Sequence, residues 1–367
     1  MQRSIIAPAE RVTNLRWGIA VLLGIGVLIN YFDRVNLTVA GPSLRKEFGI
    51  DDVGFGYLLS AFGWTYAALQ IPVGLILDRY GVVLLGRITT LLWSVASALT
   101  ALASGFGTLF ATRLLLGIGE TPTFPINAKA TGYWFPTKER GLATAIFDAA
   151  AKLATGIGVP MVAIILVAYG WRATFVVTAV LSFLFFLAFF AFYRNPGEDK
   201  RLTYAERKFI TEGGAQPEGQ TAAGSVGAAL GYLLTQRKVW GLTIGFSAYG
   251  YSFYLLLTWL PGYLVKTYHL DIIKSGAYAM IPWIVAAIGD LIVGGWLVDY
   301  LVKRGYDANR VRKTIIVVGM LLGLAIIGAA TTHDPNVAVF WITIALTGLA
   351  CTAPIGWSIP ALIAPKG

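Results

Sequence analysis

Apolar stretches long enough to cross a lipid bilayer recur along the whole sequence. Ten such stretches fall at residues 17–41, 54–77, 87–104, 107–130, 141–168, 172–193, 239–265, 275–299, 314–332 and 336–363. About 20 apolar residues cross the hydrocarbon core as a helix, and only helices or closed barrels satisfy their backbone hydrogen bonds there. The chain is 56% hydrophobic and 13% charged, whereas soluble domains carry about 25% charged residues. We therefore predict an all-α membrane protein with ten transmembrane helices.

The basic residues are distributed unevenly between the two sides of the predicted membrane. The formal net charge is +10, and with the N-terminus in the cytoplasm twenty of the 29 lysines and arginines fall in inside segments. Only five fall in outside segments, namely Arg45, Lys46, Arg172, Lys266 and Lys274. An excess of basic residues in cytoplasmic loops sets the orientation of membrane proteins. We therefore predict a multi-pass protein of the cell (inner) membrane with a cytoplasmic N-terminus, whose positive charge follows its topology and does not indicate nucleic-acid binding.

One long polar stretch interrupts the apolar pattern. Residues 194–236 are rich in charge, glycine and proline, which predicts a cytoplasmic linker with one short surface helix at 203–212. Six apolar stretches precede this linker and four follow it. We therefore predict an N-terminal six-helix bundle at 1–193 and a second bundle of four helices at 237–367.

The two halves share a pattern at corresponding positions. A glycine stands four residues before an aspartate at the cytoplasmic end of the second stretch and again of the eighth, and basic residues follow both. The residues of this pattern are Gly74, Asp78, Arg79, Gly81 and Arg87 in the first half and Gly295 and Asp299 in the second. Glycine permits close helix contact, and the acid can pair with a neighbouring helix or loop. Charge at one membrane boundary is common, but its recurrence favours a duplicated bundle, which is frequent in secondary transporters.

Two pairs of charged residues lie inside the first and fourth apolar stretches: Asp33 with Arg34, and Arg113 with Glu120. An ionised side chain at mid-bilayer costs roughly 2.5–3.5 kcal/mol on the insertion scale, and such residues usually face a cavity or an ion path. Arg34 is the candidate for binding an anionic solute, because its guanidinium matches a carboxylate bidentately and stays charged. The alternative is a structural ion pair with Asp33 or another acid. Adjacent helix residues point about 100° apart, so one of the two can face a cavity while the other faces the fourth stretch.

Arg113 and Glu120 lie seven residues apart and are predicted to share a helix face. A carboxyl group in a low-dielectric cavity is a candidate for proton exchange, and Arg113 is placed to stabilise its deprotonated form. We therefore expect Asp33, Glu120 and Arg113 to take part in proton coupling. The alternative is a permanent buried salt bridge that sets helix packing.

The fifth stretch carries a second pair of opposite charges. Asp148 and Lys152 are four residues apart and can pair directly, either as a neutralised structural pair or as a contact for the solute. We keep Lys152 as a solute-binding candidate and Asp148 as a modulating residue, while Asp290 in the eighth stretch has no assigned role. Tyr31 and Tyr66 are hydrogen-bond donors for the solute or, alternatively, packing residues.

Three segments carry a resemblance to a known family. These are RLLLGIGETPTFPINAKATGYWFPTKERG at 113–141, NYFDRVNLTVA at 30–40 and WSIPALIAPKG at 357–367. Together with the paired Gly-x3-Asp pattern, they resemble the major facilitator superfamily and, within it, the anion:cation symporter family. That family includes bacterial galactonate, hexuronate and glucarate transporters and, more distantly, sialin. The resemblance covers essentially the whole chain.

The resemblance implies roles for several residues. Asp33 and Glu120 match the proton-coupling acids of the family, Arg34 matches its anion-binding arginine, and Tyr31 and Tyr66 match cavity tyrosines. Relatives are expected to have twelve helices, so we expect ten of twelve to be present here and the second bundle to lack its last pair.

A second departure concerns the fifth stretch. Asp148 and Lys152 replace the neutral or aromatic residues that relatives more often carry there, which indicates a distinct solute preference.

The combined prediction is a monomeric secondary active transporter that carries a small organic anion, a sugar acid such as a hexonate, hexuronate or aldarate, together with protons. The alternatives are a sodium-coupled or uncoupled carboxylate carrier and a non-transporting membrane sensor of such anions. No metal-ligand spacing or nucleophile–base pair is present in the sequence, so we expect no enzyme activity, no metal and no cofactor.

Overall fold

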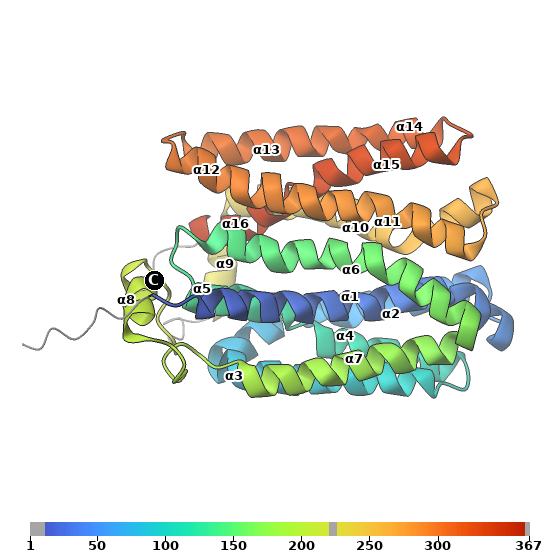
Figure 1. Ribbon diagram of the computed structural model, residues 1–367, viewed down its shortest axis with the longest axis horizontal. Helices are drawn as coiled ribbons and strands as arrows, with labels where there is room; N and C mark the ends of the chain where they lie inside the picture. Colours follow the sequence, from blue (N-terminus) through green and yellow to red (C-terminus); the bar gives the residue numbers. More distant parts are fainter. Residues whose placement is uncertain (1–11, 220–225, 364–367) are drawn as a thin grey trace, which may run out of the picture.

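The computed structural model describes residues 12–219 and 226–363, and the part of the chain in these ranges is built from helices joined by turns. The last four residues of the 357–367 segment lie outside the described residues. The long helices run side by side along one direction (Figure 1). This architecture confirms the prediction of an all-α protein.

The described helices fall into three groups. The first, which we call the first bundle, comprises α1 (Leu15–Phe48), α2 (Asp52–Ala68), α3 (Gln70–Ala101), α4 (Phe106–Glu120), α5 (Thr123–Trp134), α6 (Arg140–Tyr169) and α7 (Trp171–Phe192). The linker region contains α8 (Tyr204–Glu212) and α9 (Val226–Thr235). The second bundle comprises α10 (Arg237–Tyr268), α11 (Ile272–Gly289), the π-helix η1 (Asp290–Leu297), α12 (Val298–Lys303), α13 (Ala308–Leu322), the short 3-10 turn η2 (Gly323–Ala325), α14 (Ile326–Ala330), α15 (Pro335–Ala350) and α16 (Ala353–Ile363).

Seven helical segments of the described chain are long and apolar enough to cross a membrane. The predicted stretch 54–77 is divided between α2 and α3, and 107–130 is divided between α4 and α5. The stretch 239–265 lies in α10, which is not among the seven. The protein is thus an integral membrane protein with several apolar helices, while the exact number of ten spans stays a prediction.

Aspartates begin several of the helices. The side chains of Asp51, Asp271, Asp307 and Asp334 accept hydrogen bonds from backbone N–H groups in the first turns of α2, α11, α13 and α15. These bonds satisfy donors that have no partner within the helix, and the negative charge suits the helix N-terminus. The bond from the N–H of Lys274 holds the pKa of the Asp271 carboxyl below its usual value. These aspartates therefore help to define where α2, α11, α13 and α15 begin.

Gly81 interrupts α3. Its φ of 76° lies in the region that favours glycine, so the chain bends there between the second and third predicted stretches. The bend allows the remainder of α3 to pack along α7 in the first bundle.

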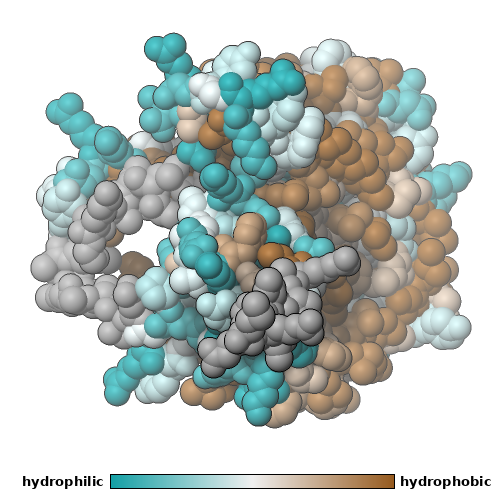
Figure 2. All heavy atoms as spheres, turned by 60° about the vertical axis from the view of Figure 1, so that its left-hand side comes forward, coloured by the Kyte–Doolittle hydropathy of each residue, from teal (hydrophilic) through white to brown (hydrophobic). Residues whose placement is uncertain are grey.

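α6 lies at the centre of the molecule. It packs along α1 within the first bundle and along α11 of the second, so it forms much of the contact between the bundles (Figure 1). A second contact joins α1 to α10. Hydrophilic residues gather at the end that carries α8, whereas hydrophobic residues cover the flank (Figure 2). This distribution suits a bundle whose sides face lipid.

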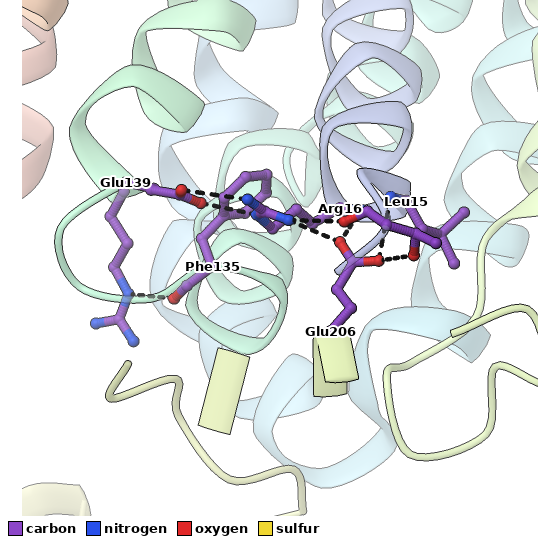
Figure 3. A network of polar contacts seen from close by, with 7 residues as sticks. Leu15, Arg16, Phe135, Glu139 and Glu206 are labelled. Carbon is purple, nitrogen blue, oxygen red and sulfur yellow. Dashed lines mark hydrogen bonds and ion pairs between the residues drawn. The ribbon is translucent and has the colours of Figure 1, made fainter. Parts of the chain in front are cut away.

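The predicted surface helix at 203–212 is present as α8, but it is anchored to the first bundle. Arg16 of α1 donates from Nε to Glu139 at 2.7 Å and from Nη1 to Glu206 of α8 at 2.9 Å. Glu206 is 0% exposed, and it also accepts from the backbone N–H of Leu15 (Figure 3). A buried carboxylate with such partners holds α8 against the start of α1. The boundaries at 193 and 236 that we predicted between bundles and linker stay predictions.

Candidate functional site between the bundles

Arg34 lies where the two bundles meet. Its Nε donates to Glu120 Oε2 of α4 at 2.9 Å, and its Nη1 donates to the hydroxyl of Tyr254 on α10 at 2.9 Å. The side chain is only 4% exposed, and its Nη2 has no hydrogen-bond partner among the described residues. A buried guanidinium whose Nη2 has no partner is suited to donate hydrogen bonds to a carboxylate ligand.

Aromatic rings surround this guanidinium. Its central carbon lies 4.5 Å from the ring centroid of Tyr31, 4.8 Å from that of Phe62 and 5.1 Å from that of Tyr66. Such stacking stabilises a cation out of water. Tyr31 also makes an edge contact with Phe253 of α10, at 6.2 Å between centroids. The two predicted tyrosines therefore adjoin Arg34, and packing and binding are compatible roles for both.

Glu120 pairs with Arg34, not with Arg113. α4 ends at Glu120, whose side chain is 0% exposed, and its Oε1 has no hydrogen-bond partner among the described residues. Arg113 makes no ion pair within 4.0 Å in the described part of the chain, and its guanidinium lies 5.6 Å from the Phe62 ring centroid. The permanent Arg113–Glu120 salt bridge that we considered is therefore absent from this geometry, because Arg34 of α1 approaches the carboxylate instead.

Asp33 points away from Arg34. Its two carboxylate oxygens accept hydrogen bonds from Ser97 of α3 at 2.7 Å and from Ser182 of α7 at 3.0 Å. We expected one of the adjacent pair to face a cavity and the other to face the fourth stretch. Arg34 instead faces both α4 and the second bundle, while Asp33, at 1% exposure, faces the interior of the first bundle. The 100° offset between neighbouring helix residues accounts for this separation.

Lys152 belongs to a cluster of three charges. Its Nζ donates to Asp148 one turn earlier in α6, as expected, and also to Asp290 Oδ2 at 2.6 Å. Asp290 begins η1 of the second bundle, so the cluster bridges the bundles. The indole N–H of Trp357 donates to Asp148 at 3.1 Å. The three side chains are nearly or fully buried, with exposures of 5% or less.

The paired glycine–aspartate pattern has different surroundings in the two halves. Lys129 of α5 forms an ion pair with Asp78 at 2.6 Å. Nothing in the described chain lies within 4 Å of a Cβ added at Gly74, so this glycine makes no close helix contact here. A Cβ added at Gly295 would lie 2.8 Å from Ala145 of α6, so close helix contact depends on this glycine. The remaining basic residues of the pattern stack on aromatic rings, Arg79 on Tyr80 at 5.4 Å and Arg87 on Phe190 at 4.4 Å.

Asp299 contacts the other bundle directly. Its carboxylate oxygens would lie 2.7 and 2.9 Å from a Cβ added at Gly141, in the first turn of α6. A carboxylate at a helix N-terminus is stabilised by the unpaired N–H groups there. The acid thus lies against the start of α6 in the other bundle, while Asp78 pairs within the first bundle.

Several residues of the site could not be selected from the sequence. Tyr254 and Asp290 gain their partners from the opposite bundle, and Ser97 and Ser182 are ordinary small polar residues in apolar helices. The isolation of Asp290 in an apolar stretch was the one available signal. In the described ranges no group of three His, Cys, Asp or Glu is arranged to hold a metal ion.

Comparison with known proteins agrees with this architecture. The chain is 40% identical over 98% of its length to an uncharacterized transporter, YybO, of Bacillus subtilis (strain 168), covering 82% of that protein. It is 34% identical over 97% of its length to a probable galactarate/D-glucarate transporter, GarP, of Escherichia coli (strain K12), covering 83% of it. A D-galactonate transporter of Escherichia coli O6:H1 is 32% identical over 97% of the chain and covered over 84%.

Solved structures show the same fold. An inward-facing, unoccupied bacterial homolog of the human lysosomal transporter Spinster superposes with a TM-score of 0.69 at 21% identity, covering 96% of this chain and 77% of that one. The profile of the Major Facilitator Superfamily matches residues 23–367. The chain is therefore a membrane transporter, not an enzyme, and it belongs to the Major Facilitator Superfamily.

Proposed function

We propose that this protein is a secondary active transporter that carries a small carboxylated solute of the sugar-acid type in symport with protons. Two observations support the solute class. Relatives covering nearly the whole chain are named galactarate/D-glucarate and D-galactonate transporters, and Nη2 of the buried Arg34 has no hydrogen-bond partner among the described residues. Hydroxyl-bearing aromatic residues beside it, Tyr31, Tyr66 and Tyr254, suit a polyhydroxylated cargo.

The observation that carries the coupling proposal is the Arg34–Glu120 ion pair. Here a carboxylate of the protein occupies part of the guanidinium that a cargo carboxylate would use. Protonation of Glu120 neutralises that carboxylate and leaves the charge of Arg34 available for the cargo. Because coupling between two ligands is reciprocal, binding of the anion also favours protonation of Glu120. A loaded site of nearly zero net charge then crosses the barrier as the bundles exchange access.

The other candidate residues have secondary roles in this proposal. Arg113 supplies positive potential near Glu120, and Asp33 exchanges protons from within the first bundle. Lys152, with Asp148 as its modulating partner, meets the cargo after the bundles rearrange, since two carboxylates surround it here. The glycine–aspartate pattern stabilises one arrangement of the bundles. We place the monomeric protein in the inner membrane with its N-terminus in the cytoplasm.

Glu120→Gln tests the coupling. In proteoliposomes this variant retains exchange of labelled galactarate, D-glucarate or D-galactonate between the two sides, because Arg34 is intact. It loses accumulation driven by a proton gradient, because no proton binds at residue 120. Normal accumulation by the variant would refute the assignment.

Sodium-free buffers complete this test. Uptake that persists without sodium and follows the imposed pH gradient supports proton symport. Dependence on sodium, or uptake insensitive to both gradients, would identify a sodium-coupled or uncoupled carrier. Binding without exchange would indicate a sensor.

A further inference from the structure

The cluster of Asp148, Lys152 and Asp290 lies in the main contact between the bundles, apart from the Arg34–Glu120 pair. α6 contributes Asp148 and Lys152, and Asp290 comes from the start of η1. The helices approach closely here, since a Cβ added at Gly295 in η1 would lie 2.8 Å from Ala145 of α6. Any motion that separates α6 from η1 must break the Lys152–Asp290 ion pair, whose length is 2.6 Å.

The formal charges of the cluster do not balance. Two carboxylates share one ammonium group, which leaves one negative charge in a site where Asp290 is 0% and Lys152 1% exposed. An uncompensated charge that is buried away from solvent is strongly unfavourable. The site therefore needs one further positive charge while the bundles are in contact.

The surroundings supply no such charge. The groups that face the cluster are Tyr249 and Phe253 from α10, Trp357 from α16 and Cys351 between α15 and α16. None of these is a cation, and among the described residues Lys152 is the one base paired with either aspartate. A proton is the smallest cation that can restore neutrality.

An unsatisfied atom marks where the proton binds. Asp290 Oδ1 is buried and has no hydrogen-bond partner among the described residues, and the carboxylates of Asp148 and Asp290 both contact the same ammonium group, that of Lys152. Two carboxylates gathered around one ammonium group cannot hydrogen-bond to each other as anions, because both are acceptors. One proton between them supplies the missing donor, as in other carboxyl pairs that share a site.

We propose that Asp148 and Asp290 together bind one proton while α6 and η1 are in contact, and release it when the bundles separate and water reaches the carboxylates. The cluster is then a second proton site, distinct from Glu120, that links protonation to bundle contact. This inference rests on alternating access as in the proposed function, but not on the identity of the cargo. The contact form holds one more proton than the separated form, so lower pH favours contact.

Infrared spectroscopy of the purified full chain, without cargo, tests the proton directly. A buried protonated carboxyl gives a carbonyl stretching band that shifts in D₂O. We expect such a band in wild type, its retention in Glu120→Gln, and its loss in Asp290→Asn and in Asp148→Asn. Both of these variants keep Lys152 with one carboxylate, so the site is neutral and folding is preserved. Asp271→Asn, at the exposed start of α11, is the matched control and leaves the band unchanged.

Two spectroscopic results would overturn the inference. One is a band that survives Asp33→Asn combined with Glu120→Gln and persists when either cluster variant is added. The other is that no band remains in Glu120→Gln. That result would include the case in which a sodium ion, and not a proton, neutralises the cluster.

The distance between the bundles gives a second readout. Spin labels at Lys138, just before α6, and Lys303, the last residue of α12, report separation at the end of the contact nearer the cluster in a Cys351→Ala background, and both positions are exposed. Lowering the pH shifts the population towards contact by up to about tenfold per pH unit. The shift persists in Glu120→Gln and disappears in Asp290→Asn. A pH response unchanged by Asp290→Asn would refute the proposal even if transport proves to be proton-coupled, and a lost response would support it even if no transport is found.

Discussion

Replacement of Arg34 by alanine is the most direct perturbation of the candidate site. In the structure this guanidinium uses Nε for Glu120 and Nη1 for Tyr254, and Nη2 has no partner among the described residues. A cargo carboxylate that binds Nη1 and Nη2 makes two charge-assisted hydrogen bonds. The substitution removes both, along with the positive charge that attracts the anion.

The magnitude follows from those two bonds. A hydrogen bond to a charged group contributes about 1.5–3 kcal/mol, so the two contribute about 3–6 kcal/mol, which corresponds to a roughly 10²–10⁴-fold loss of affinity. The same substitution leaves Glu120, which is 0% exposed, without its counter-charge. Breaking a buried ion pair destabilises a fold by about 3–5 kcal/mol. Loss of binding and loss of folding must therefore be measured separately.

A double variant separates the two effects. Arg34→Gln with Glu120→Gln removes both charges at once, so the buried site stays neutral and the unfolding temperature should stay closer to wild type than in Arg34→Ala. Calorimetric titration of the purified proteins with galactarate, D-glucarate and D-galactonate gives the affinities. Arg172→Ala, whose side chain is 50% exposed in the first turn of α7, is the control and should bind like wild type. A folded double variant with wild-type affinity would refute the role of Arg34.

Three further perturbations test the packing around the site. Gly119→Ala should lower stability by about 1–3 kcal/mol, because an added Cβ would lie 2.9 Å from a backbone nitrogen of α3; Gly18→Ala, with nothing within 4 Å, is the control, and equal thermal unfolding of the two would contradict the close approach. Arg16→Ala should release α8, because Glu206 loses its buried partner; faster hydrogen exchange in α8 is the expected result, and unchanged exchange would argue against anchoring. Asp299→Asn should weaken the contact with α6 by about 0.3–1 kcal/mol. Maleimide labelling of a cysteine introduced in the first turn of α6 should therefore increase, and unaltered labelling would show that Asp299 does not hold the two bundles together there.

The fold class and several site residues follow from local properties of the sequence. Hydropathy identifies helices that cross a membrane, and the polar linker and the repeated glycine–aspartate pattern indicate two related halves. Arg34 and Glu120 are recognisable because a charge in an apolar helix is unfavourable unless function requires it. Each of these inferences needs only the residue and its neighbours in the chain.

The partners of the buried charges depend on the tertiary structure. Glu120 lies seven residues from Arg113 yet pairs with Arg34, which is 86 positions away, and Lys152 pairs with Asp290 across 138 positions. The carboxylate of Asp33 accepts hydrogen bonds from two serines inside the first bundle, although the neighbouring Arg34 faces the second bundle. Helical spacing determines which residues share a face, but the rotation and crossing of packed helices determine what that face meets. Those quantities are set by contacts between distant segments, so only the assembled bundles decide which acid neutralises which base.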